Sequence, residues 1–191
     1  MSKQFILASA SLRRIEMLTR YGYDFEVIPA EIEEVINNEL EIEFAIEELA
    51  YLKANSVFLT HDDSVVLAAD TVVVCDNQIL GKPLDAKDAK DMLMMLSGKK
   101  HRVITGVCVL SNEKTIVDHE VTYVTFHDLS DIEIEEYLQH DEAFDKAGSY
   151  AIQGIASKFV SKVEGDYDNV VGLPLSKVTQ LLEKQGIRVA K

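Results

Sequence analysis

The chain alternates between short apolar runs typical of β-strands and segments with helical periodicity, and this alternation constrains its fold more than any other feature. The apolar runs are rich in Val, Ile, Thr and aromatic residues, which favour strands. They cover residues 4–8, 24–28, 64–75, 102–110, 115–126 and 157–163. Helical patterns occupy residues 12–21, 42–59, 86–96, 131–139 and 175–184. This order of elements predicts an α/β fold.

Turn and cap residues refine this prediction. Only the four residues Ser111–Lys114 separate two β-rich runs, a spacing that predicts a hairpin and therefore a mixed sheet with an antiparallel component. Gly22, Gly98 and Gly186 follow three helical patterns as candidate C-caps. Ser130 precedes another helical pattern as a candidate N-cap. We expect a mixed, twisted sheet flanked by helices.

Composition and charge exclude several classes of protein. With 19 Lys and Arg against 33 Asp and Glu, the net charge is −14 at pH 7, so most of the surface should repel nucleic-acid polymers and anionic membranes. The sequence has neither a signal peptide nor an apolar run of about 20 residues. We therefore expect a cytoplasmic protein with no membrane partner. Cys75 and Cys108 lie in β-like runs, and we expect both to be reduced core residues.

The stretch ILASASLRRIEML, residues 6–18, places two serines and two adjacent arginines where a strand ends and a helix begins. The N-terminus of a helix carries a partial positive charge, so cations are normally disfavoured there. If Ser11 caps the helix, Arg13 and Arg14 occupy its first turn beside free N–H donors. These groups, with the hydroxyls of Ser9 and Ser11, would suit a phosphate. Alternatively, both arginines point outward and pair with surface carboxylates.

Two charged residues interrupt apolar patterns. Lys53 falls on the apolar stripe of the segment 42–59, where its ammonium either extends to water or reaches an internal anion. Asp70 and Thr71 interrupt the apolar run 64–75. Because burying an unpaired carboxylate costs several kcal/mol, we expect Asp70 to be paired, metal-bound or at a solvent-facing strand end. A turn or bulge is the alternative, but the run resumes at once without Gly or Pro, which favours a site.

Two further segments contain charged or amide side chains beside glycines. Lys82, in LGKP, follows a glycine that allows close approach, although the pattern also fits a turn with a surface lysine. The stretch DKAGSYAIQG, residues 145–154, includes Asp145, Lys146 and Gln153. Such a segment either binds a ligand or merely connects elements.

Other candidate ligands are less specific. Glu31, Glu33 and Glu34 would suit a divalent cation, or they form a solvated face. The five histidines lack the spacing of a metal-binding pair and an adjacent nucleophile motif, so we assign them no catalytic role. Neither GxxxxGK[ST] nor GxGxxG occurs, which excludes the usual phosphate-loop and dinucleotide fingerprints.

Six sequence blocks, in the same order along nearly the whole chain, resemble the Maf family of nucleoside triphosphate pyrophosphatases. They are LASASLRR, AADTVV, LGKP, MLSGKKHRVITGV, DKAGSYAIQG and GDYDNVVGLPLSK. The resemblance implies one domain over residues 1–191, similar to the inosine triphosphatase group, with two lobes around a central cleft. It also implies hydrolysis of a nucleoside triphosphate to its monophosphate and pyrophosphate, with magnesium or manganese as cofactor. Homodimers are common in such families, so a homodimer is a further expectation.

The matching positions carry the family's site residues to this sequence. They are Ser11, Arg13, Arg14, Glu34, Lys53, Asp70, Thr71, Lys82, Asp145, Lys146 and Gln153, with Ser9 as an additional candidate. By this resemblance, Asp70 is the proton acceptor. As a hypothesis for the reaction, Glu34 and Asp70 bind the metal ion, and Asp70 orients or deprotonates the attacking water. In the same hypothesis, Arg14, Lys53 and Lys82 hold phosphate oxygens together with the Ser11 hydroxyl.

Three of these positions concern the choice of base. The resemblance to the dTTP/UTP pyrophosphatase branch depends on Arg13, Thr71 and Gln153. A glutamine amide can satisfy both O4 and N3–H of uracil or thymine, whereas an arginine has donors only and favours O4 over the amino group of cytosine. We therefore expect dTTP and UTP as substrates, with modified pyrimidine nucleotides as further candidates. Two departures from the family pattern are Leu12 in place of proline and Ala151 in place of glycine.

Two other functions compete with hydrolysis. One, which the resemblance to the family implies, is a nucleotide-responsive regulator linked to cell division, in which binding matters more than turnover. The other is a nucleic-acid-binding module, which the negative charge and the lack of a basic, aromatic face disfavour.

Overall fold

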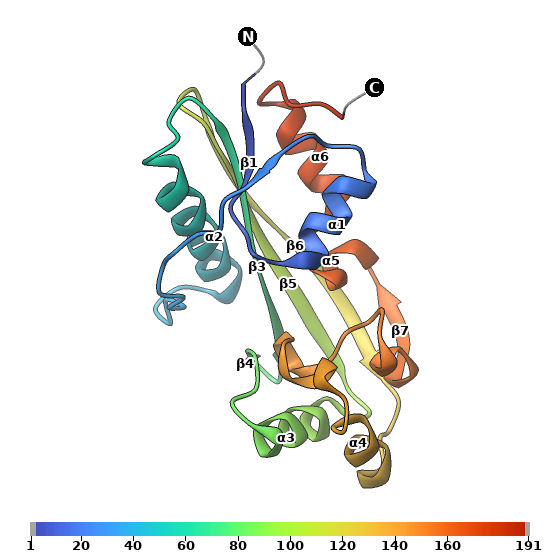
Figure 1. The fold of residues 1–191 in the computed structure, drawn as a ribbon. Coiled ribbons are helices and arrows are strands. Elements are labelled where there is room, and N and C mark those ends of the chain that lie inside the picture. Colours follow the sequence, from blue (N-terminus) through green and yellow to red (C-terminus); the bar gives the residue numbers. More distant parts are fainter. Residues whose placement is uncertain (1–2, 190–191) are drawn as a thin grey trace. The chain divides into compact units, whose positions relative to one another are not determined.

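The computed structural model describes residues 3–189, which form two compact units that alternate along the chain (Figure 1). Unit 1 comprises residues 3–70, 105–120 and 172–189, and unit 2 comprises residues 71–104 and 121–171. One boundary between the units falls at the peptide bond that joins Asp70 to Thr71. The predicted single domain with two lobes around a cleft stays a prediction.

The described residues contain a sheet with seven strands. The strands are β1 (Phe5–Leu7), β2 (Glu26–Val27), β3 (Val65–Cys75), β4 (Gln78–Leu80), β5 (Lys100–Leu110), β6 (Thr115–Phe126) and β7 (Val160–Glu164). Their order is β2-β1-β3-β5-β6-β7, and β4 pairs with β3. β1 runs parallel to both β2 and β3, whereas the pairs β3–β4 and β6–β7 are antiparallel. The prediction of a mixed α/β fold is therefore confirmed.

The helices that the helical patterns predict are present in the predicted order, and α5 is an additional short helix. They are α1 (Leu12–Arg20), α2 (Ile42–Phe58), α3 (Ala86–Leu96), α4 (Asp131–Tyr137), α5 (Tyr167–Val171) and α6 (Leu175–Glu183). Gly22, Gly98 and Gly186 adopt the positive φ angles expected after a helix, and Ser130 forms a capping box with Glu133. Within residues 3–189, no helix is both long enough and apolar enough to cross a membrane.

Three elements differ from the prediction. The segment 157–163 was expected to be a strand throughout, but a 3-10 turn at Ile155–Phe159 precedes β7, so this prediction is wrong over its first three residues. β4 was not predicted, because its hairpin turn uses Asp76 and Asn77 at φ +49° and +62° without a glycine. The short helix α5 has no clear apolar period and was also missed.

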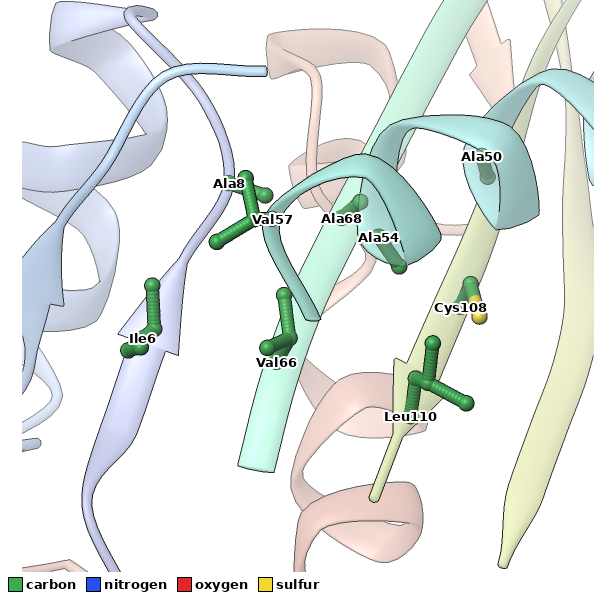
Figure 2. Close-up of a cluster of buried hydrophobic side chains, with 9 residues drawn as sticks. All are labelled: Ile6, Ala8, Ala50, Ala54, Val57, Val66, Ala68, Cys108 and Leu110. Carbon is green, nitrogen blue, oxygen red and sulfur yellow. The ribbon is translucent and has the colours of Figure 1, made fainter. Parts of the chain in front are cut away.

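Figure 2 shows the part of the unit 1 core in which α2 packs on β1, β3 and β5. The small side chains of Ala50 and Ala54 allow the helix to lie close to the sheet. Gly106 on β5 serves the same approach, because a Cβ atom there would lie 2.4 Å from the backbone oxygen of Ile46. The cluster consists of Ile6, Ala8, Ala50, Ala54, Val57, Val66, Ala68, Cys108 and Leu110. One face of β3 is therefore turned toward α2.

On the other side of the sheet of unit 1 lie α1 and α6 (Figure 1). Met17 and Leu18 of α1 are buried, as are Leu181 and Leu182 of α6. The segment that follows α1 is tied to α6 by the Tyr23 hydroxyl, which donates to Thr179 Oγ1 at 3.2 Å. Both helices therefore contribute buried side chains to unit 1.

Unit 2 has its own aromatic core. The rings of His101, Phe126 and Tyr150 make edge contacts with one another, with centroids 4.8–5.5 Å apart. Phe159 continues this cluster to Tyr137. All five side chains are buried. Aromatic pairs of this geometry stabilise a core beyond the area that they bury.

Both cysteines are free and buried, as predicted. Burial raises the pKa of the Cys75 thiol, and it raises the pKa of Cys108 to about 12. Because the thiolate is the reactive form, neither residue is a nucleophile at neutral pH.

Candidate functional site

The turn between β1 and α1 brings the two serines and Arg14 together. Ser11 occupies the N-cap position with extended backbone angles, but its side chain makes no capping hydrogen bond. Ser9 takes part instead: its Oγ accepts from the backbone N–H of Ser11 at 3.2 Å and from Arg14 Nη1 at 3.3 Å. Arg13 and Arg14 lie in the first helical turn, as predicted.

Arg14 points inward from this turn. Its Nη1 donates to the backbone oxygen of Ala69 at 2.7 Å, and its Nε donates to that of Gly172 at 2.9 Å. Desolvation lowers the pKa of the guanidinium, and the nearby Asp70 carboxylate opposes this effect. For Arg14, the alternative of an outward side chain on the surface is therefore wrong. The guanidinium is held by two backbone carbonyl groups next to Asp70.

The position of Asp70 follows from the period of β3. Alternate strand residues share a face, so Asp70 lies on the face that carries Val66 and Ala68 and that is turned toward α2. The strand is continuous from Val65 to Cys75, without the turn considered as an alternative. A carboxylate is thus placed at the end of an apolar row, beneath a helix that carries Lys53.

Lys53 meets this carboxylate. Its Nζ lies 2.5 Å from Asp70 Oδ1 and 2.7 Å from Glu34 Oε1. Lys53 is only 7% exposed, and the side chain of Asp70 is 13% exposed, whereas Glu34 is largely accessible in the segment before α2. Of the two alternatives for Lys53, the structure therefore shows the one in which its ammonium reaches an internal anion. Asp70 is paired, as expected.

The two carboxylates have the chemistry of a divalent cation site. One oxygen of Glu34 and one oxygen of Asp70 both reach a single positively charged atom, which shows that they converge. Magnesium and manganese prefer such hard oxygen ligands, and magnesium commonly binds through one or two carboxylates while substrate phosphates and waters complete its shell. The donor set fits either ion.

A second group of predicted residues lies in unit 2. Asp145 contacts both Lys146 and Lys82, at 2.9 and 3.4 Å. The hydrogen bond from Lys146, with the charge of Lys82, lowers the pKa of Asp145. A backbone hydrogen bond of 3.0 Å from Gly148 to the oxygen of Gly81 ties the two segments together. These loops therefore form one structure that holds two lysines around a carboxylate.

The remaining predicted residues are Arg13, Thr71 and Gln153. Arg13 is partly buried on α1, Thr71 is partly buried on β3, and Gln153 is exposed. The left-handed backbone of the loop 145–154 occurs at Gly148 and Ser149, with φ +68° and +61°, and not at Ala151. Alanine in place of the family's glycine is therefore compatible with this loop.

One cluster was missed by the sequence analysis. Glu47 of α2 and the neighbours Asp118 and His119 of β6 place three possible metal-ligating atoms within 4.8 Å of one another. His119 Nδ1 lies 2.6 Å from Glu47 Oε1. Lys177 of α6 pairs with Asp118 at 2.9 Å and also donates to the backbone oxygen of His119. The sequence signal that could have indicated this cluster is the presence of charged residues inside the apolar run 115–126.

Known proteins resemble this chain over most of its length. The sequence model of the Maf-like protein family matches residues 4–185. A protein of Alkaliphilus oremlandii (strain OhILAs) named dTTP/UTP pyrophosphatase is 55% identical over 183 residues, which cover 94% of this chain and 95% of that protein. A protein of the same name from Bacillus cytotoxicus is 48% identical, with 95% of each chain covered.

Solved structures with the same fold are more distant in sequence. The Staphylococcus aureus Ham1 protein superposes with a TM-score of 0.58 at 12% identity, over 96% of this chain and all of that one. A HAM1 protein from Coxiella burnetii gives a TM-score of 0.54 at 13% identity, over 96% and 100% of the two chains. Their likeness supports the mixed α/β fold, and the family match covers almost the whole chain. This chain belongs to the Maf-like protein family.

Proposed function

We propose that this protein is a nucleoside triphosphate pyrophosphatase that hydrolyses dTTP and UTP to the monophosphate and pyrophosphate. The observation that carries the proposal is the convergence of Glu34 and Asp70 on one cationic atom, in a chain 55% identical to a protein named dTTP/UTP pyrophosphatase. A nucleic-acid-binding module would not need this arrangement of acidic groups.

Hydrolysis at the α-phosphorus requires an acceptor for the proton of the attacking water. Asp70 has this role in the proposal, because its carboxylate is held on a rigid strand and is only partly accessible. Arg14 acts on the same region through the backbone of Ala69, which it holds at 2.7 Å. Proton acceptors are effective when their position is restrained in this way.

The triphosphate needs positive charge to balance it. Lys53 and Arg14 supply such charge in unit 1, with the hydroxyls of Ser9 and Ser11 near the start of α1. Lys82 keeps its predicted phosphate-binding role, and within unit 2 it lies 3.4 Å from one anionic group, the Asp145 carboxylate. A charge-assisted hydrogen bond to phosphate is stronger than one between neutral groups.

Glu34 and Asp70 are the proposed ligands of magnesium or manganese. When bound, such an ion neutralises phosphate charge and polarises the bond that breaks. Either metal suits these ligands, because both accept carboxylate oxygens. A homodimer and a cytoplasmic location stay predictions from the sequence.

Base selection is assigned to Arg13, Thr71 and Gln153. The exposed Gln153 amide has both a donor and an acceptor, which match N3–H and O4 of uracil or thymine. Arg13 adds donors only and disfavours the amino group of cytosine. Modified pyrimidines that keep O4 and N3–H fit the same pattern.

The test is pyrophosphate release from a panel of canonical nucleoside triphosphates with Mg²⁺. We expect UTP and dTTP to exceed CTP and the purine nucleotides in kcat/KM. Comparable rates for all canonical triphosphates would contradict the assigned base selection. Tight UTP binding without pyrophosphate release would favour the nucleotide-responsive regulator.

A further inference from the structure

The Lys53 ammonium lies where two metal ligands of the proposed function meet. Its Nζ contacts Asp70 Oδ1 at 2.5 Å and Glu34 Oε1 at 2.7 Å. We propose that Lys53 is an internal cation that competes with the divalent metal ion for these two carboxylates and so weakens metal binding by the nucleotide-free protein. This inference depends on the proposed metal site, but its test measures metal binding without any turnover.

The competition follows from distance and charge. A magnesium ion binds carboxylate oxygens at about 2.0–2.1 Å, so an ion shared by Glu34 and Asp70 would lie within a few ångströms of the ammonium. Two cations that close repel strongly in a partly buried site, because the effective dielectric there is lower than in water. The lysine and the metal therefore exclude each other at these oxygens.

Burial makes the exchange dependent on a new partner for the lysine. Lys53 is 7% exposed, and its backbone is fixed because Ala50 and Ala54 of the same helix are packed against the sheet. An ammonium that loses its carboxylates in such a place must find another anion or remain uncompensated. The phosphates of the substrate supply that anion, so nucleotide and metal should assist each other's binding.

The two carboxylates differ in their freedom to respond. Asp70 is fixed in the middle of β3, whereas Glu34 belongs to a segment without helix or strand, and 61% of its side chain is exposed. Glu34 can therefore turn from the ammonium toward an incoming ion at little cost. Asp70 therefore contacts the ammonium in the metal-free state and would contact the ion in the metal-bound state.

Mn²⁺ titration of the nucleotide-free protein, followed by the EPR signal of the free ion, tests the proposal. Lys53→Met removes the charge, and we expect it to bind Mn²⁺ about tenfold more tightly than the wild type, within the usual range of coupling between sites. Lys53→Gln should show the same gain, and because its amide can still donate to Asp70, it serves if the methionine variant does not fold. Lys53→Arg keeps the charge and should remain close to the wild type.

Two controls make the result specific. Lys90 also contacts two carboxylates, those of Asp131 and Glu135, and Lys90→Met should leave Mn²⁺ affinity unchanged. Adding Asp70→Asn to Lys53→Met should abolish the gain. Equal or weaker Mn²⁺ binding in both uncharged Lys53 variants would overturn the proposal, as would a gain that survives Asp70→Asn. Tighter Mn²⁺ binding in a protein that releases no pyrophosphate from UTP would instead refute the proposed function alone.

Discussion

The guanidinium of Arg14 holds the backbone oxygen of Ala69, at 2.7 Å from Nη1, and thereby restrains the residue that precedes Asp70. The same side chain holds the oxygen of Gly172 through Nε at 2.9 Å. One arginine thus connects the start of α1 with the strand that carries the proposed proton acceptor. Its importance for the site follows from geometry as well as from charge.

Arg14→Lys tests this link. A lysine keeps the charge but cannot make two directed hydrogen bonds from one planar group. We expect a loss of about 1–3 kcal/mol in the free energy of unfolding, because a partly buried carbonyl loses its donor, and a fall of roughly a hundredfold in kcat. Urea denaturation and steady-state kinetics with UTP measure the two effects. Arg20→Lys, at the exposed end of the same helix, should change neither quantity.

Asp70→Asn should abolish most turnover without unfolding the protein. The amide keeps an oxygen for Lys53 but accepts protons poorly, so we expect kcat to fall by about 10²–10⁴. Asp118 is a suitable control, because it is also paired with a lysine, Lys177, at 2.9 Å. Near-normal kinetics in Asp70→Asn, or an equal loss in Asp118→Asn, would remove Asp70 from the proposed role.

Gln153→Ala should reduce the discrimination between UTP and CTP. Loss of the amide removes the hydrogen bonds assigned to O4 and N3–H, and we expect the ratio of kcat/KM values to fall by roughly tenfold or more. Because Gln153 is exposed, the free energy of unfolding should stay within about 0.5 kcal/mol of the wild type. An unchanged ratio would assign base selection to other residues.

Gly106→Ala should destabilise unit 1. The added methyl group would lie 2.4 Å from the Ile46 oxygen and 2.9 Å from the Glu47 nitrogen, both backbone atoms of α2. We expect a cost of about 1–3 kcal/mol, typical of an overpacked core. The matched variant is Gly81→Ala, where a Cβ atom meets nothing within 4 Å. Equal thermal unfolding of the two variants would contradict the close approach of α2 to β5.

Acid should destabilise unit 2 through His101. Burial lowers the pKa of this side chain to about 4, whereas an unfolded histidine titrates near 6.5. The unfolded state therefore binds the proton first, so stability is lost as the pH falls from about 6.5 to about 4, by up to roughly 3 kcal/mol. Unfolding free energies between pH 7 and pH 4 give the slope. His101→Phe should flatten it in this range, and an unchanged slope would point to other groups.

Much of the fold could be predicted from local patterns. The span of α3 and of β6 matches the prediction at both ends, because the apolar period of each is clear and bounded by turn residues. The turn at Asp76 and Asn77 escaped because both residues adopt positive φ without a glycine. Local composition also could not separate the 3-10 turn at Ile155–Phe159 from a strand, since both favour the same residues here.

The candidate site was less predictable from the residues alone. An interrupted apolar run pointed to Asp70, and an apolar helical stripe pointed to Lys53, but neither pattern states that the two side chains meet. The contact depends on strand period, helix packing and register together. His119 was missed for the same reason, because its partner Glu47 lies 72 positions away in the chain.

The methyl groups of Ala50 and Ala54 set the height of α2 above the sheet, and with it the reach of the lysine between them. A bulkier residue at either position would lift the helix and draw the ammonium away from Asp70. Such a chain would keep all its charged residues but would lose the contact between the Lys53 ammonium and Asp70. Two of the least reactive side chains in the protein therefore act as the spacers on which its chemistry depends.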